Sequence, residues 1–587
     1  MTGAIRSRWL LALACLSVIL LAAFVRLSGT GWDGGSGLHP DERHMIFSLS
    51  ETLRQLVEGR GMTWGELWFG TGLSPLDPRH GGRLYVYGEL PHLAMSLLSH
   101  ALGVKGWADM LALTRTASAV LDAYTCLAVF VLTMSVTRQP AAALAASIFY
   151  AAAPLALQHA NFFTVDVWLA ASAAWCLVAT TLLALAPPQG RALMWAALAG
   201  GLAAVALACK LPGALLSLGI AIAVFVGFRR HRSMRRALLE LAVAALSFLF
   251  TFRLASPFSF EGPGFFALMP SQAMIAGYLE AARLAGSPEF PPNWQWMGGY
   301  GPMHALRDIA VMAIGPVLAA AVLAGVPAMR RAGGTLWMPT AFVTLCFCAY
   351  AVFGSPPVLR YMLPALPGLC VTAGAALGRS WQTTRGRAVF FGVLACALYW
   401  GSGMAALHSY LPNSRVAASQ WLWENTVPGT VVAHESVWDD RLPLPIRMGD
   451  GQNWTWPEDH GQFSFVNLDV EAPDTPVKAA RIAERLERAD LLVLSSERLR
   501  QPIQALPARF PMMSAFYSML ADGRLCFVPL YRHHSTYPLP GLPLDDAWVQ
   551  ESWSVYDHPS VEIYRKSTCF LKTDIETQLL QAFDSGS

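Results

Sequence analysis

The chain has 587 residues, of which 54% are hydrophobic and only 14% are charged, and its formal net charge is +3. Long apolar runs alternate with short basic or Pro/Gly-rich joints, which is typical of a membrane protein and excludes one large water-soluble core. The excess arginines lie in short loops rather than on one exposed face, which argues against nucleic acid as a partner.

In chain order, eleven apolar runs are candidates to cross the ~30 Å of hydrocarbon in a bilayer. They are residues 8–26, 111–135, 140–160, 167–187, 192–209, 212–228, 237–254, 306–326, 336–353, 359–378 and 388–408. The first run follows Arg6 and Arg8 without a small-residue cleavage site, so we expect a retained span rather than a signal peptide.

A twelfth run, residues 90–104, is short and contains His92 and His100. If this run does not cross, the arginines of the short loops, including RRHRSMRR at 229–236, lie on the cytoplasmic side together with the N-terminus. If it crosses, all of these loop arginines after Arg6 and Arg8 lie on the outer side of the membrane. We therefore predict an α-helical polytopic membrane protein with about eleven transmembrane helices, and place residues 90–104 in the outer head-group region.

This topology divides the chain into two parts. Residues 1–408 form the membrane domain, with outer loops at 27–110 and 255–305. Residues 409–587 contain more charges and turns, and alternate β-prone runs such as ADLLVLSS with helical stretches such as VKAARIAERLERA, so we expect a separate extracytoplasmic α/β domain. Cys526 and Cys569 lie in this domain, and their spacing leaves a disulfide open.

Acidic residues occur at two points on the predicted outer side. Asp41 and Glu42 follow Pro40 at the start of a predicted helix, and Asp166 lies at a membrane boundary in QHANFFTVDVW. Helix capping alone would explain Asp41 and Glu42. Carboxylates beside hydrocarbon are costly unless they face water, a ligand or a partner, so the two points together favour a shared polar cavity.

Three cations occupy outer ends of spans, where the positive-inside rule does not favour them: Arg115, Lys210 and Arg360. Snorkelling accounts for any one of them. Together with Asp41 and Asp166 they favour a site for an anionic head group, since Arg and Lys are the usual partners of phosphate oxygens.

The outer loop 255–305 is rich in proline and aromatic residues and contains Trp294 and Gln295. It suits an interfacial aromatic belt as well as a lid over a lipid-linked substrate. Trp294 and Gln295 are candidate sugar contacts. The acidic and basic segments add four further candidate contacts for donor or acceptor, which are His39, Tyr87, His159 and Tyr361.

These groups suit inverting transfer of a sugar from a lipid phosphate. A carboxylate, for which Asp41 is the candidate, takes the proton of an acceptor hydroxyl while cations stabilise the departing phosphate. Asp41, Glu42 and Asp166 would also be able to hold one Mg²⁺ or Mn²⁺ ion, although we expect no metal or other cofactor.

The order of HPDE, YGELPHL, LTRTASAVLDA, FFTVDVW, CKLPGALL, SPF, FPPNWQW and LRYMLPALPG resembles bacterial lipid-carrier-dependent glycosyltransferases of the GT-C fold, relatives of the protein O-mannosyltransferases and aminoarabinose transferases. The resemblance implies a polyprenyl-phosphate sugar donor, a glycan, protein or lipid acceptor, and a bacterial inner membrane. It implies that Asp41, with Glu42 beside it, and Asp166 match the family's two acidic loop positions. Arg115, Lys210 and Arg360 match positive positions near the carrier phosphate.

Two other functions remain open from the sequence. A transporter or flippase of a lipid-linked sugar would use many spans with polar boundaries, but it should show inverted repeats and polar groups at the bilayer midplane. A non-catalytic scaffold would leave Asp41, Asp166 and Lys210 unexplained.

Overall fold

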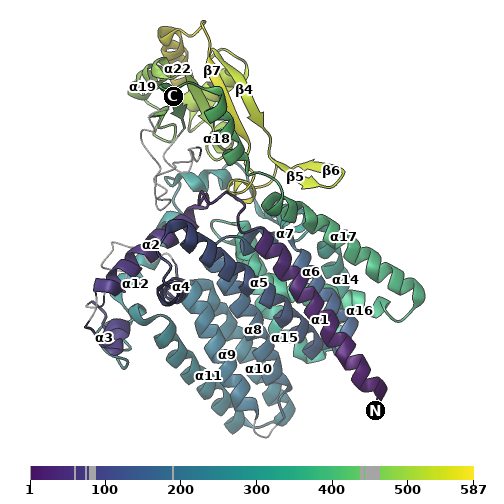
Figure 1. The fold of residues 1–587 in the computed structure, drawn as a ribbon. Coiled ribbons are helices and arrows are strands. Elements are labelled where there is room, and N and C mark those ends of the chain that lie inside the picture. Colours follow the sequence, from purple (N-terminus) through teal and green to yellow (C-terminus); the bar gives the residue numbers. More distant parts are fainter. Residues whose placement is uncertain are drawn as a thin grey trace. The chain divides into compact units, whose positions relative to one another are not determined.

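The computed structural model describes residues 2–58, 61–72, 74, 76–77, 87–187, 191–435, 442 and 463–586. The chain forms two compact units (Figure 1). The membrane unit comprises Met1–Thr30, Asp41–Arg283 and Ala305–Ser409, and the C-terminal unit comprises Gly31–Pro40, Leu284–His304 and Tyr410–Ser587. Two pieces of the predicted outer loops therefore group with the C-terminal unit.

The membrane unit is a bundle of long apolar helices. Its main helices are α1 (Thr2–Ser28), α5 (Trp107–Thr137), α8 (Val165–Leu185), α9 (Arg191–Cys209), α10 (Leu216–His231), α11 (Met234–Ala255), α15 (Met338–Phe353), α16 (Leu366–Ser380) and α17 (Thr384–Ser409). Within the described residues, nine helical segments are long and apolar enough to cross a membrane, or up to eleven if two bent pairs each count as one span. The predicted polytopic helical fold is confirmed.

In the two bent pairs, an apolar run that is continuous in the sequence forms two helices with a break between them. α6 (Pro140–Ala152) and α7 (Pro154–Ala160) meet at 58°, because Pro154 lacks the N–H that would continue the helix. α13 (Pro302–Asp308) with the π-helical turn Ile309–Ala313 meets α14 (Pro316–Gly333) at 109°. Gly315 has a φ of 83° at this second break, a conformation that favours glycine.

Small residues let the helices approach closely. A Cβ built on Gly200 of α9 would lie 2.1 Å from the carbonyl oxygen of Ala244 in α11, and one on Gly401 of α17 would lie 2.2 Å from that of Ala152 in α6. Close contact through glycine and alanine replaces the hydrophobic effect as the source of helix association within lipid. Substitutions at these glycines would force the paired helices apart.

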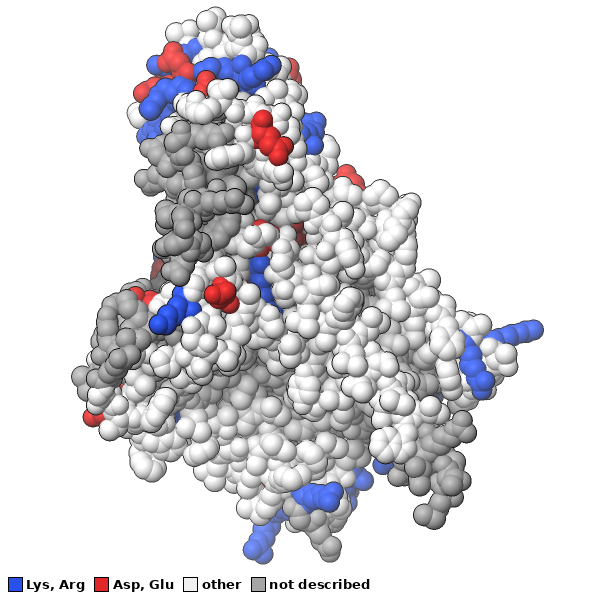
Figure 2. Space-filling model, in the orientation of Figure 1, with Lys and Arg blue, Asp and Glu red and all other residues white. Residues whose placement is uncertain are grey.

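The ends of the bundle differ in charge. Arg138 follows α5, Arg191 begins α9, and Arg230 and Arg331 lie in the last turns of α10 and α14. Figure 2 shows blue side chains at the lower end of the membrane unit. The positive-inside rule predicts that such an end faces the cytoplasm. The opposite end, where α9 and α11 finish and α10 begins, carries α2 (Pro40–Glu58) and the shorter helices α3 (Trp64–Phe69), α4 (Leu90–Leu102) and α12 (Gln272–Ala285).

The C-terminal unit contains a mixed five-stranded sheet, as the predicted α/β domain requires. The strand order is β2 (Phe463–Asn467), β1 (Thr430–His434), β3 (Leu491–Leu494), β7 (Val561–Lys566) and β4 (Phe527–His533). The first three strands are parallel, and β7 is antiparallel to both of its neighbours. Cys526 and Cys569 form a disulfide with 5.7 Å between their Cα atoms, which answers the question that their spacing left open.

Helices cover both faces of this sheet. α18 (Ser414–Asn425) packs on one face through Ala418 and Leu422. α19 (Pro476–Arg488), α21 (Pro511–Ala521) and α22 (Lys572–Gly586) cover the other, where Trp294 joins the core. A two-stranded hairpin of β5 (Thr536–Leu539) and β6 (Leu542–Asp545) completes the unit.

A buried imidazole holds the chain that follows the hairpin. His558 lies between two carboxylates, with Nδ1 2.6 Å from Asp557 Oδ1 and Nε2 2.7 Å from Asp546 Oδ2. Burial alone would lower the pKa of His558, but Asp557 and Asp546 raise it to about 10. The Asp546 pKa is correspondingly held below its usual range.

The raised His558 pKa predicts loss of stability at alkaline pH. The folded pKa lies above the unfolded value of ~6.5, so the contribution is complete below ~6.5 and is lost as pH rises to about 10. Hydrogen exchange of residues 535–560 in the intact protein, corrected for intrinsic rates, should show protection falling between pH 7 and 10. The His558→Asn variant should lack that dependence, and an equal dependence in both proteins would contradict the prediction.

Candidate functional site

Four charged side chains meet at the end of the bundle where α9 and α11 finish. Arg360 Nη1 lies 2.9 Å from Asp41 Oδ2, and its Nε lies 3.6 Å from Asp166 Oδ2. Lys210 Nζ donates to Asp166 Oδ1 at 2.7 Å. The structure therefore brings together four of the six charged residues that the sequence singled out, in the order Asp41, Arg360, Asp166, Lys210.

Each member of this cluster lies at a helix terminus. Asp41 and Asp166 are in the first turns of α2 and α8, where the helix dipole favours a carboxylate. Lys210 follows α9 in an extended conformation before the 3₁₀ turn Leu211–Leu215, and Arg360 lies in the 3₁₀ turn Leu359–Ala365 that precedes α16. Rigid helices thus position groups that are far apart in the sequence.

Aromatic rings line the same cluster. Lys210 Nζ lies 4.5 Å from the ring centroid of Tyr361, which stacks on Tyr350 of α15 with 5.0 Å between centroids. A cation over an aromatic face is held by attraction to the ring electrons. Burial, together with the Asp41 carboxylate to which its hydroxyl is hydrogen-bonded, raises the pKa of Tyr87 well above its ordinary value. Sequence reasoning named Tyr87 and Tyr361 but missed Tyr350, which lies inside an apolar run.

Glu42 and Arg115 form a separate, fully buried ion pair. Arg115 Nε and Nη2 donate to the two oxygens of Glu42 at 2.9 and 2.6 Å, and Nη1 donates to the Thr30 carbonyl at 2.9 Å. The backbone N–H of Phe163 also donates to Glu42, at 2.9 Å. This pair ties α2 to α5 and to the turn before α8, so it fixes the elements that carry Asp41 and Asp166.

The remaining candidate contacts lie in two places. His159 of α7 lies near Asp166. His39 belongs to the C-terminal unit, where its ring centroid lies 4.1 Å from that of Tyr556. Trp294 is 2% exposed in the core of that unit, and the Gln295 side chain donates to Glu551 at 3.1 Å.

The sequence reasoning also missed a buried carboxylate near Tyr87. Glu89, at the start of α4, accepts hydrogen bonds from the hydroxyls of Ser256 and Ser259 at 2.9 and 2.8 Å and from the Phe258 N–H at 3.0 Å. Burial raises the pKa of Glu89 to about 7 despite these donors. Glu89 thereby holds the turn after α11 against α4, and its place two residues after Tyr87 in YGELPHL was the available signal.

The carboxylates of the cluster face cations rather than one another. Within the ranges that the structure describes, no three His, Cys, Asp or Glu side chains are arranged to hold a metal ion. Asp41 and Asp166 each have a positive partner at 2.9 Å or less. The residues present fit an anion between Lys210 and Arg360 better than a metal ion between the two carboxylates.

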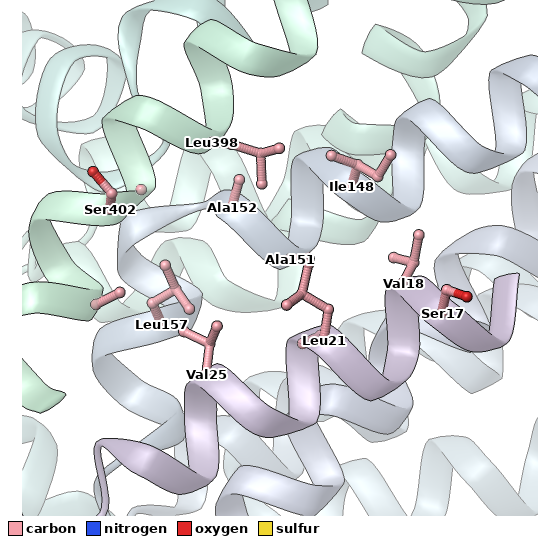
Figure 3. Close-up of a pocket in the computed structure, with 13 residues that line it drawn as sticks. Ser17, Val18, Leu21, Val25, Ile148, Ala151, Ala152, Leu157, Leu398 and Ser402 are labelled. Carbon is pink, nitrogen blue, oxygen red and sulfur yellow. The ribbon is translucent and has the colours of Figure 1, made fainter. Parts of the chain in front are cut away.

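A separate apolar groove of about 330 Å³ lies between α1, α6, α7 and α17 (Figure 3). Its walls include Leu21, Ile148, Leu157 and Leu398, and none of the charged residues above lines it. The hydroxyl of Ser17 is bonded to a backbone carbonyl of its own helix, as is that of Ser402. This surface offers contact to hydrocarbon and no polar chemistry.

The fold and the cluster define a multi-pass membrane protein with a charged site at one end of its helices. No protein-family model matches the chain, and no curated protein does. Solved structures are similar to the chain at low sequence identity.

ArnT from Cupriavidus metallidurans bound to undecaprenyl phosphate is 15% identical over 70% of this chain and 72% of that chain, with a TM-score of 0.41. The apo form of ArnT is 14% identical over 95% and 98%, with a TM-score of 0.42. The oligosaccharyltransferase AglB from Archaeoglobus fulgidus, in complex with an inhibitory peptide and a dolichol-phosphate, is 13% identical over 91% and 74%, with a TM-score of 0.47. At these TM-scores the likeness is partial, and the chemistry of the site depends on this chain's own side chains.

Proposed function

We propose that the protein transfers a sugar from a polyprenyl-phosphate donor to an acceptor hydroxyl on the extracytoplasmic side of the bacterial inner membrane, with inversion at the anomeric carbon. The observation that carries this proposal is the row Asp41, Arg360, Asp166 and Lys210. In this row the partly exposed Asp41 pairs with Arg360, and the buried Asp166 lies between Arg360 and Lys210. Lipid-linked phosphate arrives at this depth, because its head group stays at the interface while its chain stays in hydrocarbon.

Lys210 and Arg360 bind the donor phosphate in this mechanism. Both are paired with carboxylates in the protein alone, and Arg360 shares its guanidinium between Asp41 and Asp166. A phosphate that bridges Lys210 and Arg360 would take over part of this pairing, which releases Asp41 for chemistry. Tyr361 holds Lys210 by its ring face and so limits where the ammonium group can move.

Asp41 serves as the base. Its carboxylate takes the proton of the acceptor hydroxyl as the acceptor oxygen forms a bond to the anomeric carbon. The bond between that carbon and the phosphate oxygen breaks, and its electron pair leaves with the polyprenyl phosphate. Lys210 and Arg360 stabilise the negative charge that develops there. Asp166 keeps the two cations in place, and Glu42 with Arg115 positions the helices that carry both acids.

The reaction is tested with the intact protein in liposomes and a panel of radiolabelled polyprenyl-phosphate sugars. We expect one donor to be consumed and its sugar to appear on an acceptor with the opposite anomeric configuration. The Lys210→Met variant should lose about 10²-fold to 10³-fold in kcat/KM, as when one charge-stabilising donor is removed. Lys105→Met is the matched control, since Lys105 is exposed outside the cluster. Movement of the donor across the bilayer without transfer would instead identify a transporter.

A further inference from the structure

Six apolar side chains outside the candidate spans are exposed in α3, in the loop after α11 and in α12, which are here together named the loop surface. They are Trp64, Phe266, Leu268, Met269, Ile275 and Leu279. Phe266 is 89% exposed, Met269 73%, Trp64 72% and Leu279 67%. Single exposed apolar residues are ordinary, but a group of large ones marks a surface that contacts something other than water.

The helix α12 presents its apolar face outward. Its exposed residues lie along one stripe, which is apolar in the middle and polar at each end, whereas Gly277 is buried. They are Gln272, Ile275, Ala276, Leu279, Ala282 and Arg283. A helix on a water-facing surface shows the reverse pattern, with its apolar stripe toward the core. Contact between this apolar face and water is therefore unfavourable.

The loop surface continues the lipid-facing side of a span. Leu246 and Phe250 of α11 are 66% and 57% exposed, as expected of residues that face hydrocarbon. The Phe250 ring lies 5.6 Å from that of Phe265, which lies 5.3 Å from that of Phe266. The aromatic contacts thus run from the span onto the loop without a polar interruption.

The loop is also built to hold this shape. Arg253, which is fully buried near the end of α11, donates to the carbonyls of Pro257, Gly264 and Phe265 at 2.7, 2.7 and 3.0 Å. Isolated β-bridges join Gly70 to Pro263 and Phe260 to Pro270. A surface held by this many bonds is preformed, so it binds a partner without a large ordering cost.

We propose that the loop surface docks on the lipid bilayer itself, at its interface with water, with Phe266 and Leu279 among the acyl chains. Continuity with the lipid-facing side of α11 selects bilayer lipid over a protein partner. Trp64 has the amphipathic ring that interfaces favour. Because Glu89 bonds the turn after α11 to α4, this docking would fix the depth of the segment that carries Tyr87.

Photo-crosslinking in nanodiscs tests this proposal independently of catalysis. Benzoylphenylalanine replaces Phe266 in one full-length protein and Leu279 in a second, and phospholipid adducts are counted by mass spectrometry. The control places the same probe at Leu542, which is 56% exposed on β6 of the C-terminal unit. We expect at least about tenfold more adduct at both test positions than at Leu542, since the probe reacts with C–H bonds of the chains around it. Adduct at the control level, or crosslinks between two copies of the chain, would overturn the proposal.

Discussion

Replacement of Asp41 by asparagine should lower kcat for sugar transfer by about 10²-fold to 10⁴-fold, the range that general-base catalysis contributes. The amide keeps the shape of the side chain and a hydrogen-bonding oxygen near Arg360, but it cannot take the acceptor's proton. KM for the donor should not rise, because Lys210 and Arg360 are retained and the neutral amide competes with the phosphate for Arg360 less than the carboxylate does. The measurement is steady-state transfer with the donor identified from the liposome panel.

Asp109→Asn is the matched control for this variant. Asp109 is also an aspartate in the first turn of a helix, α5, but it is exposed and outside the charged cluster. Its kcat should equal that of the wild type. If Asp41→Asn keeps its rate within about threefold while folding normally, Asp41 is not the base, because such a loss is far below what proton transfer supplies. Asp166 would then be the next carboxylate to test.

The spans and the charged residues at their ends could be predicted from the sequence, because placing polar or charged groups in hydrocarbon costs free energy. Long apolar runs have few ways to fold, so most of the predicted spans correspond to helices. Charged residues at the outer ends of spans are expensive there unless they have a partner. That physical constraint identified Asp41, Asp166, Lys210 and Arg360, which the structure brings into one cluster.

Contacts between residues that are far apart in the chain could not be predicted from the sequence. Arg115 and Glu42 both had the right type and side of the membrane for the charged cluster, but Arg115 contacts Glu42 across 73 positions and is fully buried with it. The packing of α2 on α5 determines that Arg115 pairs with Glu42 and does not join the charged cluster. The same holds for Trp294, an aromatic residue in a proline-rich loop that becomes core of the C-terminal unit. Local sequence patterns show that such a residue can make a contact, but they do not identify its contact partner.

The Glu42–Arg115 pair should be among the strongest single supports of the membrane unit. Glu42→Gln leaves the buried Arg115 guanidinium without a counter-charge, and breaking a buried pair in this way costs about 3–5 kcal/mol. The expected result is a marked fall in the thermal unfolding temperature of the detergent-solubilised protein, with Arg115→Met giving a similar fall.

The control for this pair is Arg283→Met. Arg283 pairs with Glu280 at a comparable distance of 2.7 Å, but their side chains are 65% and 41% exposed. An exposed pair contributes only about 0–1 kcal/mol, so this variant should unfold close to the wild-type temperature. If Arg115→Met is as stable as Arg283→Met yet loses transfer activity, then Arg115 acts on the donor phosphate directly. If both stability and activity fall together, and the double variant Glu42→Gln/Arg115→Met regains stability, then the pair acts by positioning α2 and α8.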